Sequence, residues 1–249
     1  MPAAVARQFL LFVAVLAPLE LLLPARTQGP LRRGTLTDLL HFAVNPFLIA
    51  AGGSLLLALL GAVVPKLGAA QPWGLQFAEI FVVSELLGYW VHRLSHTVPW
   101  LWRFHAVHHS NTELDFLAAH RQHPLEAIWL VGVANLPVVA LGFDVEPILG
   151  FILAQKLYTA FLHANVRIGF GRFTLLLASP RFHHWHHDLN SRGNYASALP
   201  IFDKLFGSYR LPPGFPSQYG CDQPVASSWW GQLLLRPWRS AGRRSASAA

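Results

Sequence analysis

Cysteine and charge are both scarce in this sequence. Cys221 is the only cysteine among 249 residues, which excludes a disulfide framework, a thiolate zinc site and a cysteine-ligated iron–sulfur cluster. Charged residues make up 12% of the chain and hydrophobic residues 53%, a balance too apolar for a typical soluble domain. Any bound metal must therefore be held mainly by histidine and carboxylate groups.

Signs of a resident redox cofactor or of nucleic-acid binding are also missing. No G-x-G-x-x-G motif follows a predicted strand, so the electrons for any redox reaction must come from another protein. The formal charge is +7 and the pI about 10.2, but the basic residues are scattered near the ends of apolar runs. This distribution is typical of membrane orientation and does not indicate a nucleic-acid partner.

Long apolar runs predict membrane spans. Five segments approach the length that crosses a bilayer, roughly 8–24, 44–64, 75–91, 127–143 and 147–163. The first is interpreted as a retained anchor and not a signal peptide, because Arg7 is its only early basic residue and no small-residue cleavage site precedes Arg26. The last two are short and could form a hairpin. We therefore expect an all-α integral membrane protein with about four to five transmembrane helices.

The arginines favour one orientation in the membrane. They follow the first, third and fifth spans, as Arg26, Arg32, Arg33, Arg93, Arg103, Arg121, Arg167, Arg172 and Arg181. The opposite side has only Arg7, Lys66 and the acidic turn "FDVE" at 143–146. The positive-inside rule predicts that every histidine cluster faces the cytoplasm.

Histidine is the residue that the sequence has in excess. Twelve of the thirteen histidines lie between His92 and His187. His92 and His96 form an H-x-x-x-H box, and two H-x-x-H-H boxes consist of His105, His108 and His109 and of His183, His186 and His187. Residues at i, i+3 and i+4 share a helical face, so each box is expected to present its rings to one point. Ser179 and Pro180 predict the start of the helix that carries the last box.

These boxes predict a metal site. Their eight imidazoles exceed the three or four protein ligands that one zinc ion takes, so two metals are expected. Imidazole ligands alone do not identify the metal, because zinc, copper, iron and nickel all bind them. Two metals with open coordination positions at the edge of a membrane bundle suit the activation of dioxygen beside a lipid chain. Isolated histidines need no such role, and His41 and His184 are interpreted as ordinary polar residues.

Six blocks in order resemble one family. "ELLGYWVHRLSH", "WRFHAVHHS", "HRQHPLE", "FLHANVRIGFG", "SPRFHHWHH" and "NYASALPIFDKLFGSY" are similar to successive blocks of the fatty acid hydroxylase and sterol desaturase superfamily, over about Glu85 to Tyr209. The resemblance implies a membrane-bound di-iron oxygenase that hydroxylates or desaturates a carbon–hydrogen bond of a lipid. It also implies a helical membrane anchor topped by a cytoplasmic, histidine-lined helical cap. Two iron ions and an external electron donor, a ferredoxin or a cytochrome-type protein, are implied as well.

The resemblance also implies the ligand set. The box histidines match the family's metal ligands, and so does His163 in "FLHAN": His92, His96, His105, His108, His109, His163, His183, His186 and His187. His123 in "RQHPLE" matches a further block and is included as a candidate that could be either a ligand or a support for one. His120 is treated as a neighbour.

Some positions depart from the family or leave a choice open. Glu85 stands where relatives often have Asp, and Phe202 where many have Trp, which puts the transfer of a particular substrate in doubt. Glu85 inside an apolar span needs a partner, either Arg93 or a ligand histidine, unless it is a protonated carboxyl bonded to a neighbouring helix. Asn194 and Tyr195 could orient ligands or simply form a turn.

The sequence thus predicts three regions: an N-terminal membrane anchor at 1–74, a catalytic domain at 75–210 and a partly disordered C-terminal tail at 211–249. The expected activity is that of an oxidoreductase, a non-haem di-iron lipid hydroxylase or desaturase in contact with its lipid substrate in the membrane. The alternative is a membrane metal-binding or metal-transport protein that uses the histidine clusters reversibly.

Overall fold

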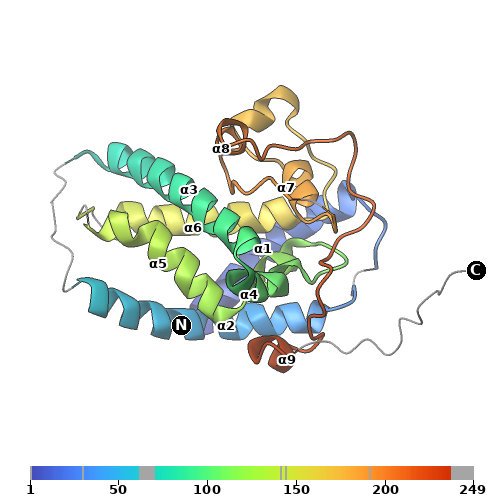
Figure 1. The fold of residues 1–249 in the computed structure, drawn as a ribbon, viewed down its shortest axis with the longest axis horizontal. Helices are drawn as coiled ribbons and strands as arrows, with labels where there is room; N and C mark the ends of the chain where they lie inside the picture. Colours follow the sequence, from blue (N-terminus) through green and yellow to red (C-terminus); the bar gives the residue numbers. More distant parts are fainter. Residues whose placement is uncertain are drawn as a thin grey trace, which may run out of the picture.

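The chain folds almost entirely into helices and loops. A computed structural model describes residues 2–29, 31–61, 71–140, 142–143, 145–190 and 192–236, and these contain no β-strand beyond two isolated bridges. The long helices are α1 (Pro2–Leu22), α2 (Thr35–Gly61), α3 (Trp73–Thr97), α5 (Pro124–Ala140) and α6 (Val145–His163). Shorter helices gather at one end (Figure 1): α4 (Pro99–His109), η1 (Phe116–His120), η2 (Gly171–Leu175), α7 (Pro180–His186), α8 (Ile201–Leu205) and α9 (Trp229–Leu233).

Three helices are long and apolar enough to cross a membrane. They are α1, the Thr35–Leu55 part of α2, and α3. The predicted spans at 127–143 and 147–163 correspond to α5 and α6, which have 17 and 19 residues and are not among the three. The all-α integral membrane class is confirmed, whereas the count of four to five spans stays a prediction.

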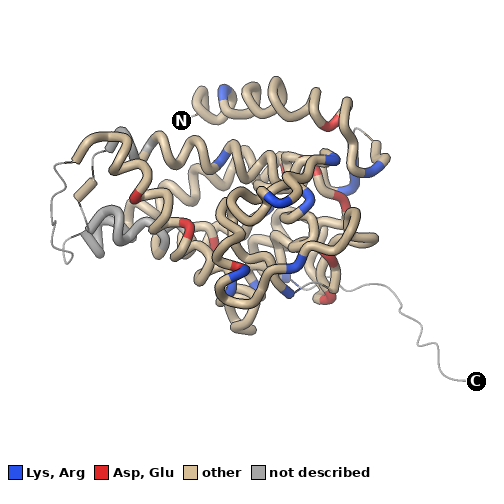
Figure 2. The backbone as a smooth tube through the Cα atoms, turned by 90° about the horizontal axis from the view of Figure 1, so that it is seen from above, with Lys and Arg blue, Asp and Glu red and all other residues tan. Residues whose placement is uncertain are grey.

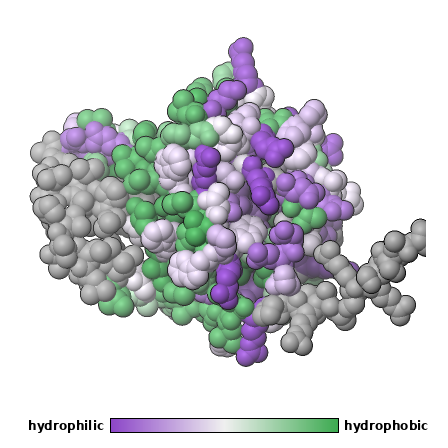
Figure 3. Space-filling view, in the orientation of Figure 1, coloured by the Kyte–Doolittle hydropathy of each residue, from purple (hydrophilic) through white to green (hydrophobic). Residues whose placement is uncertain are grey.

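The surface divides into an apolar end and a polar end. Leu10, Leu21 and Leu22 of α1 are 66%, 80% and 76% exposed, which is the arrangement expected of side chains that face lipid. Hydrophobic residues gather over the long helices in Figure 3, and polar residues over the end formed by the short ones. Most lysines and arginines in Figure 2 lie at this second end, the cap.

The first two helices pack into the same core as the cap. Phe12 and Leu16 of α1 and Phe42 of α2 lie with η1 and with Ala160 and Ala164 at the end of α6. Glu20 completes the junction, because its Oε1 accepts hydrogen bonds of 2.9 Å from the backbone N–H groups of both Phe116 and Asn165. The boundary at residue 74 remains a prediction, but the two sides of it share one hydrophobic cluster.

Two local sequence signals place the histidines. Val98 is extended and Pro99 starts α4, so α3 ends just after His96 and the chain turns before the second box, as predicted. Ser179 caps α7 by accepting a hydrogen bond of 3.3 Å from Phe182 N–H, and Pro180 is the first helical residue. The last box therefore lies at the end of a short helix that packs on α6.

The C-terminal segment is partly described. Residues 211–236 run along the cap and end beyond α9, which is fixed to α2 because His41 Nε2 lies 2.7 Å from Gln232 Oε1. The predicted disorder from Arg239 onward falls outside the described residues, as do Lys66 and the end of the predicted second span at 62–64.

Candidate metal centre

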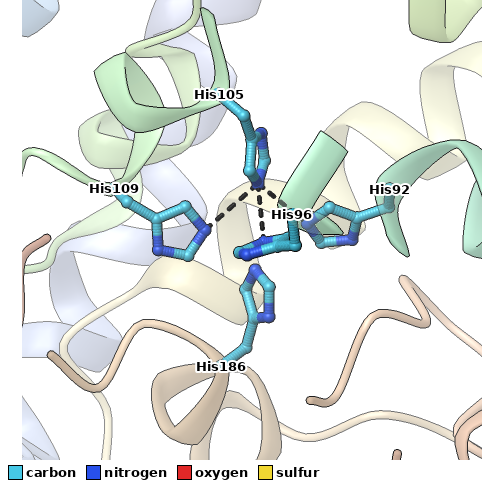
Figure 4. A group of neighbouring side chains, drawn as sticks. All are labelled: His92, His96, His105, His109 and His186. Carbon is cyan, nitrogen blue, oxygen red and sulfur yellow. Dashed lines mark hydrogen bonds between the residues drawn. The ribbon is translucent and has the colours of Figure 1, made fainter. Parts of the chain in front are cut away.

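Nine of the ten predicted ligands come together in two groups. The first group is His92, His96, His105, His109 and His186, and the second group is His108, His163, His183 and His187. Within each group, one ring nitrogen from every histidine lies within 4.8 Å of all the others. Figure 4 shows the first group, with rings from α3, α4 and α7 pointing toward one another.

The boxes are divided between the groups, which differs from the expectation that each box addresses one point. His105 and His109 belong to the first group and His108 to the second, while His183 and His187 belong to the second and His186 to the first. Residues four apart on a helix lie within about 40° of each other, but successive residues differ by about 100°. An H-x-x-H-H box therefore supplies two rings to one group and one ring to the other.

Hydrogen bonds to Nδ1 orient the rings of the first group. His92 Nδ1 donates to the backbone carbonyl of Tyr195 at 2.7 Å, and His186 Nδ1 donates to the carbonyl of Gly193 at 2.9 Å. His105 Nδ1 donates to a carboxylate oxygen of buried Glu126. In each of the three rings the neutral tautomer then leaves a lone pair on Nε2.

The second group is anchored by backbone alone. His108 Nδ1 donates to the carbonyl of Arg121 at 3.1 Å, and His163 Nδ1 donates to the carbonyl of Thr159, one turn back in α6, at 2.8 Å. The Nδ1 atoms of His183 and His187 have no partner in the part of the chain that the structure describes. All four side chains are buried, so the group is closed to water on every described side.

The unprotonated nitrogens face one another at short range. The Nε2 atoms of His92 and His105 are 3.1 Å apart, as are those of His108 and His163. Each of these four neutral rings has one N–H proton, and it is donated from Nδ1 to an oxygen. No proton is therefore left to form a hydrogen bond between the facing Nε2 atoms. Burial lowers the pKa of His105 and of His108 to about 3, so the rings are neutral at ordinary pH.

These features fit metal ions. Nitrogens bound to one ion at about 2.0–2.1 Å lie roughly 2.8–3.4 Å apart, and the Nε2 atom of His105 is 3.1, 2.9 and 3.1 Å from those of His92, His96 and His109 (Figure 4). Converging lone pairs repel unless a cation lies between them. Each group could hold a metal, with four or five imidazoles available to it.

The other histidines have different surroundings. His123, the tenth candidate, lies outside both groups: its Nε2 donates to the carbonyl of Leu233 at 3.0 Å, and its Nδ1 accepts from Leu125 N–H at 3.2 Å. Nε2 therefore ties His123 to α9 and Nδ1 ties it to the first turn of α5, while its role as a ligand or as a support stays a prediction. His184 is satisfied by Tyr219 and by the carbonyl of Ala164, and His120 packs between Phe12 and Phe42.

Among the described residues, Glu85 bonds neither Arg93 nor a ligand histidine, so the alternative of a buried carboxyl bonded to a neighbouring element is the one that fits. Its Oε2 accepts from the backbone N–H groups of Ala198 at 2.6 Å and Leu199 at 3.3 Å, so it holds the chain after the last box. Arg93 instead donates to the hydroxyl of Tyr89 at 2.8 Å and to the carbonyl of Phe206 at 3.0 Å. The sequence left open whether Asn194 and Tyr195 orient ligands or simply form a turn. The turn at 193–196 does orient two of the grouped histidines, but through its backbone: the carbonyl of Tyr195 accepts from His92 and that of Gly193 accepts from His186.

Asp203 stabilises the turn at 193–196 through hydrogen bonds to its backbone. Its carboxylate accepts from the N–H groups of Tyr195 at 2.7 Å and Ala196 at 2.8 Å, and from the hydroxyl of Ser208 at 2.6 Å. Burial raises the pKa of Asp203, although these hydrogen bonds oppose the rise. Glu126 and Asp203 are supporting residues that the sequence analysis did not single out. Their positions in the blocks "HRQHPLE" and "PIFDKLFGSY" were the available signal.

Comparison with known proteins gives a consistent family. The fatty acid hydroxylase family model matches residues 77–208. The chain is 31% identical to the ornithine lipid hydroxylase of Rhizobium tropici over 258 residues, which cover 95% of this chain and 76% of that protein.

Two animal proteins match over shorter lengths. Identity to the alkylglycerol monooxygenase of Homo sapiens is 32% over 160 residues, which cover 62% of this chain but only 34% of that protein. Methylsterol monooxygenase 1 of Gallus gallus is 28% identical over 141 residues, 55% of this chain and 47% of that protein. No solved structure matches significantly. With its two histidine groups inside the matched segment, the chain belongs to the fatty acid hydroxylase and sterol desaturase superfamily and is an oxidoreductase.

Proposed function

We propose that this chain is a membrane-bound di-iron oxygenase that hydroxylates or desaturates a carbon–hydrogen bond of a lipid, with dioxygen and external electrons. The observation that carries the proposal is the pair of histidine groups, with seven of nine side chains buried, whose unprotonated Nε2 atoms converge near the ends of α3 and α6. The names of the relatives support a lipid substrate, because they describe an ornithine lipid hydroxylase, an alkylglycerol monooxygenase and a methylsterol monooxygenase.

In this proposal the nine grouped histidines hold two iron ions, one in each group. Iron supplies the chemistry of dioxygen activation. The chain supplies neutral nitrogen ligands, and the carbonyls of Tyr195, Gly193 and Arg121 keep their rings in register. The buried surroundings exclude water from the second group, and the half-buried His92 and His96 leave the first group the more accessible.

The orientation and the electron donor belong to the same proposal. Arginines near the ends of the candidate spans favour a cytoplasmic cap. No redox cofactor motif occurs in the sequence, so a ferredoxin or a cytochrome-type protein would deliver the electrons. Basic residues at the cap (Figure 2) suit an acidic donor.

Metal analysis of the purified protein together with lipidomics of cells that express it tests the proposal. About two irons per chain and a lipid that gains one oxygen or loses two hydrogens are expected. Cells that express the His108→Ala variant are the control, because this change removes one ligand of the second group. Stoichiometric zinc without any lipid change after reconstitution with iron would favour the alternative, a reversible metal-binding or transport protein.

A further inference from the structure

A polar cleft lies next to the C-terminal end of α4. Two adjoining hollows of about 660 and 470 Å³ lie between the α4–η1 connection and segment 217–227. Both are lined by Ser110 and Thr112 on one side and by Cys221 on the other. No histidine lines either hollow, so the cleft is separate from the metal centre.

Unpaired hydrogen-bond donors line the larger hollow. Asn111 is 1% exposed, and its Oδ1 accepts from Arg32 Nη1 at 3.2 Å, whereas its Nδ2 is buried without a partner among the described residues. The Arg33 side chain is exposed and makes no hydrogen bond or ion pair within that part of the chain. A buried amide N–H without an acceptor is costly, so an acceptor brought by a ligand would be stabilising here.

The charges at the cleft favour an anion. Arg32 and Arg121 are compensated inside the protein by Asp38 and Asp115. The guanidinium groups of two further arginines form no ion pair with any residue that the structure describes. Arg33 lies at the larger hollow, where only its backbone N–H bonds a carboxylate, that of Glu113, and Arg26 lies at the smaller one, 4.0 Å from the ring centroid of Tyr219. Asp222 is the one acidic residue that lines the larger hollow, and it is exposed.

The depth of the cleft relates it to the membrane surface. Arg26 follows α1, whose candidate span ends at Leu22, and Arg33 precedes the candidate span that begins at Thr35. The hydroxyl of Thr37 donates to the carbonyl of Ser227 at 2.9 Å, so the rim of the cleft is fixed to the start of that span. Anionic headgroups occupy this level of a bilayer and attract arginine.

From these observations we propose that the cleft binds a phosphate-type oxyanion, carried by a lipid headgroup or free in solution. Arg33 and Asn111 Nδ2 are its donors in the larger hollow, and Arg26 supplies the positive charge at the smaller one. This site is independent of the proposed oxygenase reaction. It lies next to the metal centre all the same, because Arg121 lines it and the carbonyl of Arg121 accepts the hydrogen bond of His108.

Thermal unfolding of the full chain in detergent tests the site. Inorganic phosphate and a short-chain phosphatidylglycerol are each added at constant ionic strength, with chloride as the reference. We expect the Tm of the unaltered protein to rise by about 2–4 °C with phosphatidylglycerol. A similar rise with phosphate would show that the site admits the free ion, and a rise with phosphatidylglycerol alone that the anion must be held on a lipid.

Three variants separate the site from general effects of salt. Arg33→Gln removes a charged side chain that makes no hydrogen bond or ion pair among the described residues. Asn111→Asp keeps the oxygen that Arg32 bonds and puts a negative charge at the cleft. Both should lose the rise in Tm. Arg103→Gln, which changes another exposed arginine, on α4, should keep it. Equal rises in all four proteins would indicate non-specific salt stabilisation and would overturn the proposal, as would no rise with either compound.

Discussion

The two histidine groups are built from the same boxes but differ in their surroundings. The second group has four histidines, all buried, and its two anchored rings are held by backbone carbonyls. The first group has five histidines, of which His92 and His96 are half-buried, and one of its rings is held by the carboxylate of Glu126. Access from outside is therefore expected at the first group, whereas the second is enclosed.

Two sequence boxes of the same pattern therefore form two groups that differ in size and burial. Each H-x-x-H-H box contributes two rings to one group and one ring to the other, and the group that receives two rings differs between the boxes. The box at His105 gives two rings to the first group, and the box at His183 gives two to the second. Only the first group receives rings from the end of a candidate membrane span, and those are the two less buried ones.

The largest difference between the groups is expected on removal of a ligand. His163→Ala would leave the second group with three rings, below the number that a closed metal site takes. We expect the iron content to fall by about one per chain and lipid oxidation to fall more than about 100-fold. Metal analysis and product formation measure both effects.

His96→Ala is the matched change in the first group. It leaves four rings there, so a larger share of the metal should remain and the loss of activity should be smaller. Both variants must first be shown to insert in the membrane at the level of the unaltered protein. Greater metal loss from His96→Ala than from His163→Ala would reverse the comparison.

A second effect should be confined to the first group. Glu126→Gln keeps an oxygen that can accept from His105 Nδ1 but removes the negative charge behind the ring. Changes to such supporting groups cost about 10–100-fold in metal affinity or activity. Iron retention during dialysis against a chelator measures the effect, which should involve only one of the two ions.

Glu113→Gln is the control for this change, because Glu113 is a partly exposed carboxylate whose one hydrogen bond among the described residues is from the backbone N–H of Arg33. It should release iron as the unaltered protein does. If Glu126→Gln also leaves the release of iron unchanged, the carboxylate does not support the metal.

The histidines were predictable from the sequence because their spacing is local. The helix periods, the break at Pro99 and the cap at Ser179 lie within a few residues of the boxes, and they place the rings without knowledge of the tertiary fold. The division of each box also follows from helical geometry, although the sequence analysis expected one common point.

The supporting contacts were not predictable in the same way. The carbonyl of Tyr195 is 103 residues from His92, and Glu126 is 21 residues from His105. These pairs exist only because α5 and the turn at 193–196 pack beside the cap helices. His123 depends on the tertiary fold in the same way: the sequence left it open between a ligand and a support, and its Nε2 bonds the carbonyl of Leu233, 110 residues away.

A third prediction concerns the backbone that supports the first group. A Cβ atom on Gly193 would lie 2.4 Å from the backbone oxygen of Ser208, so Gly193→Ala must displace the carbonyl that accepts from His186. We expect a loss of about 1–3 kcal/mol in stability and faster release of one iron. Gly88→Ala, where a Cβ meets nothing within 4 Å, is the control and should change neither. Unchanged iron release in Gly193→Ala would mean that the carbonyl does not orient the ring.

The smallest effect is expected from Tyr195→Phe, because the contact that matters there is made by the backbone. The Tyr195 carbonyl accepts from His92, but its hydroxyl has no hydrogen-bond partner among the described residues, and its ring packs 5.1 Å from that of His96. Phenylalanine keeps the carbonyl and the ring, so iron content should be unchanged and activity should stay within about twofold. A large fall in activity at full iron content would show instead that the hydroxyl contacts the substrate, and it would place the reacting end of the lipid beside the first group.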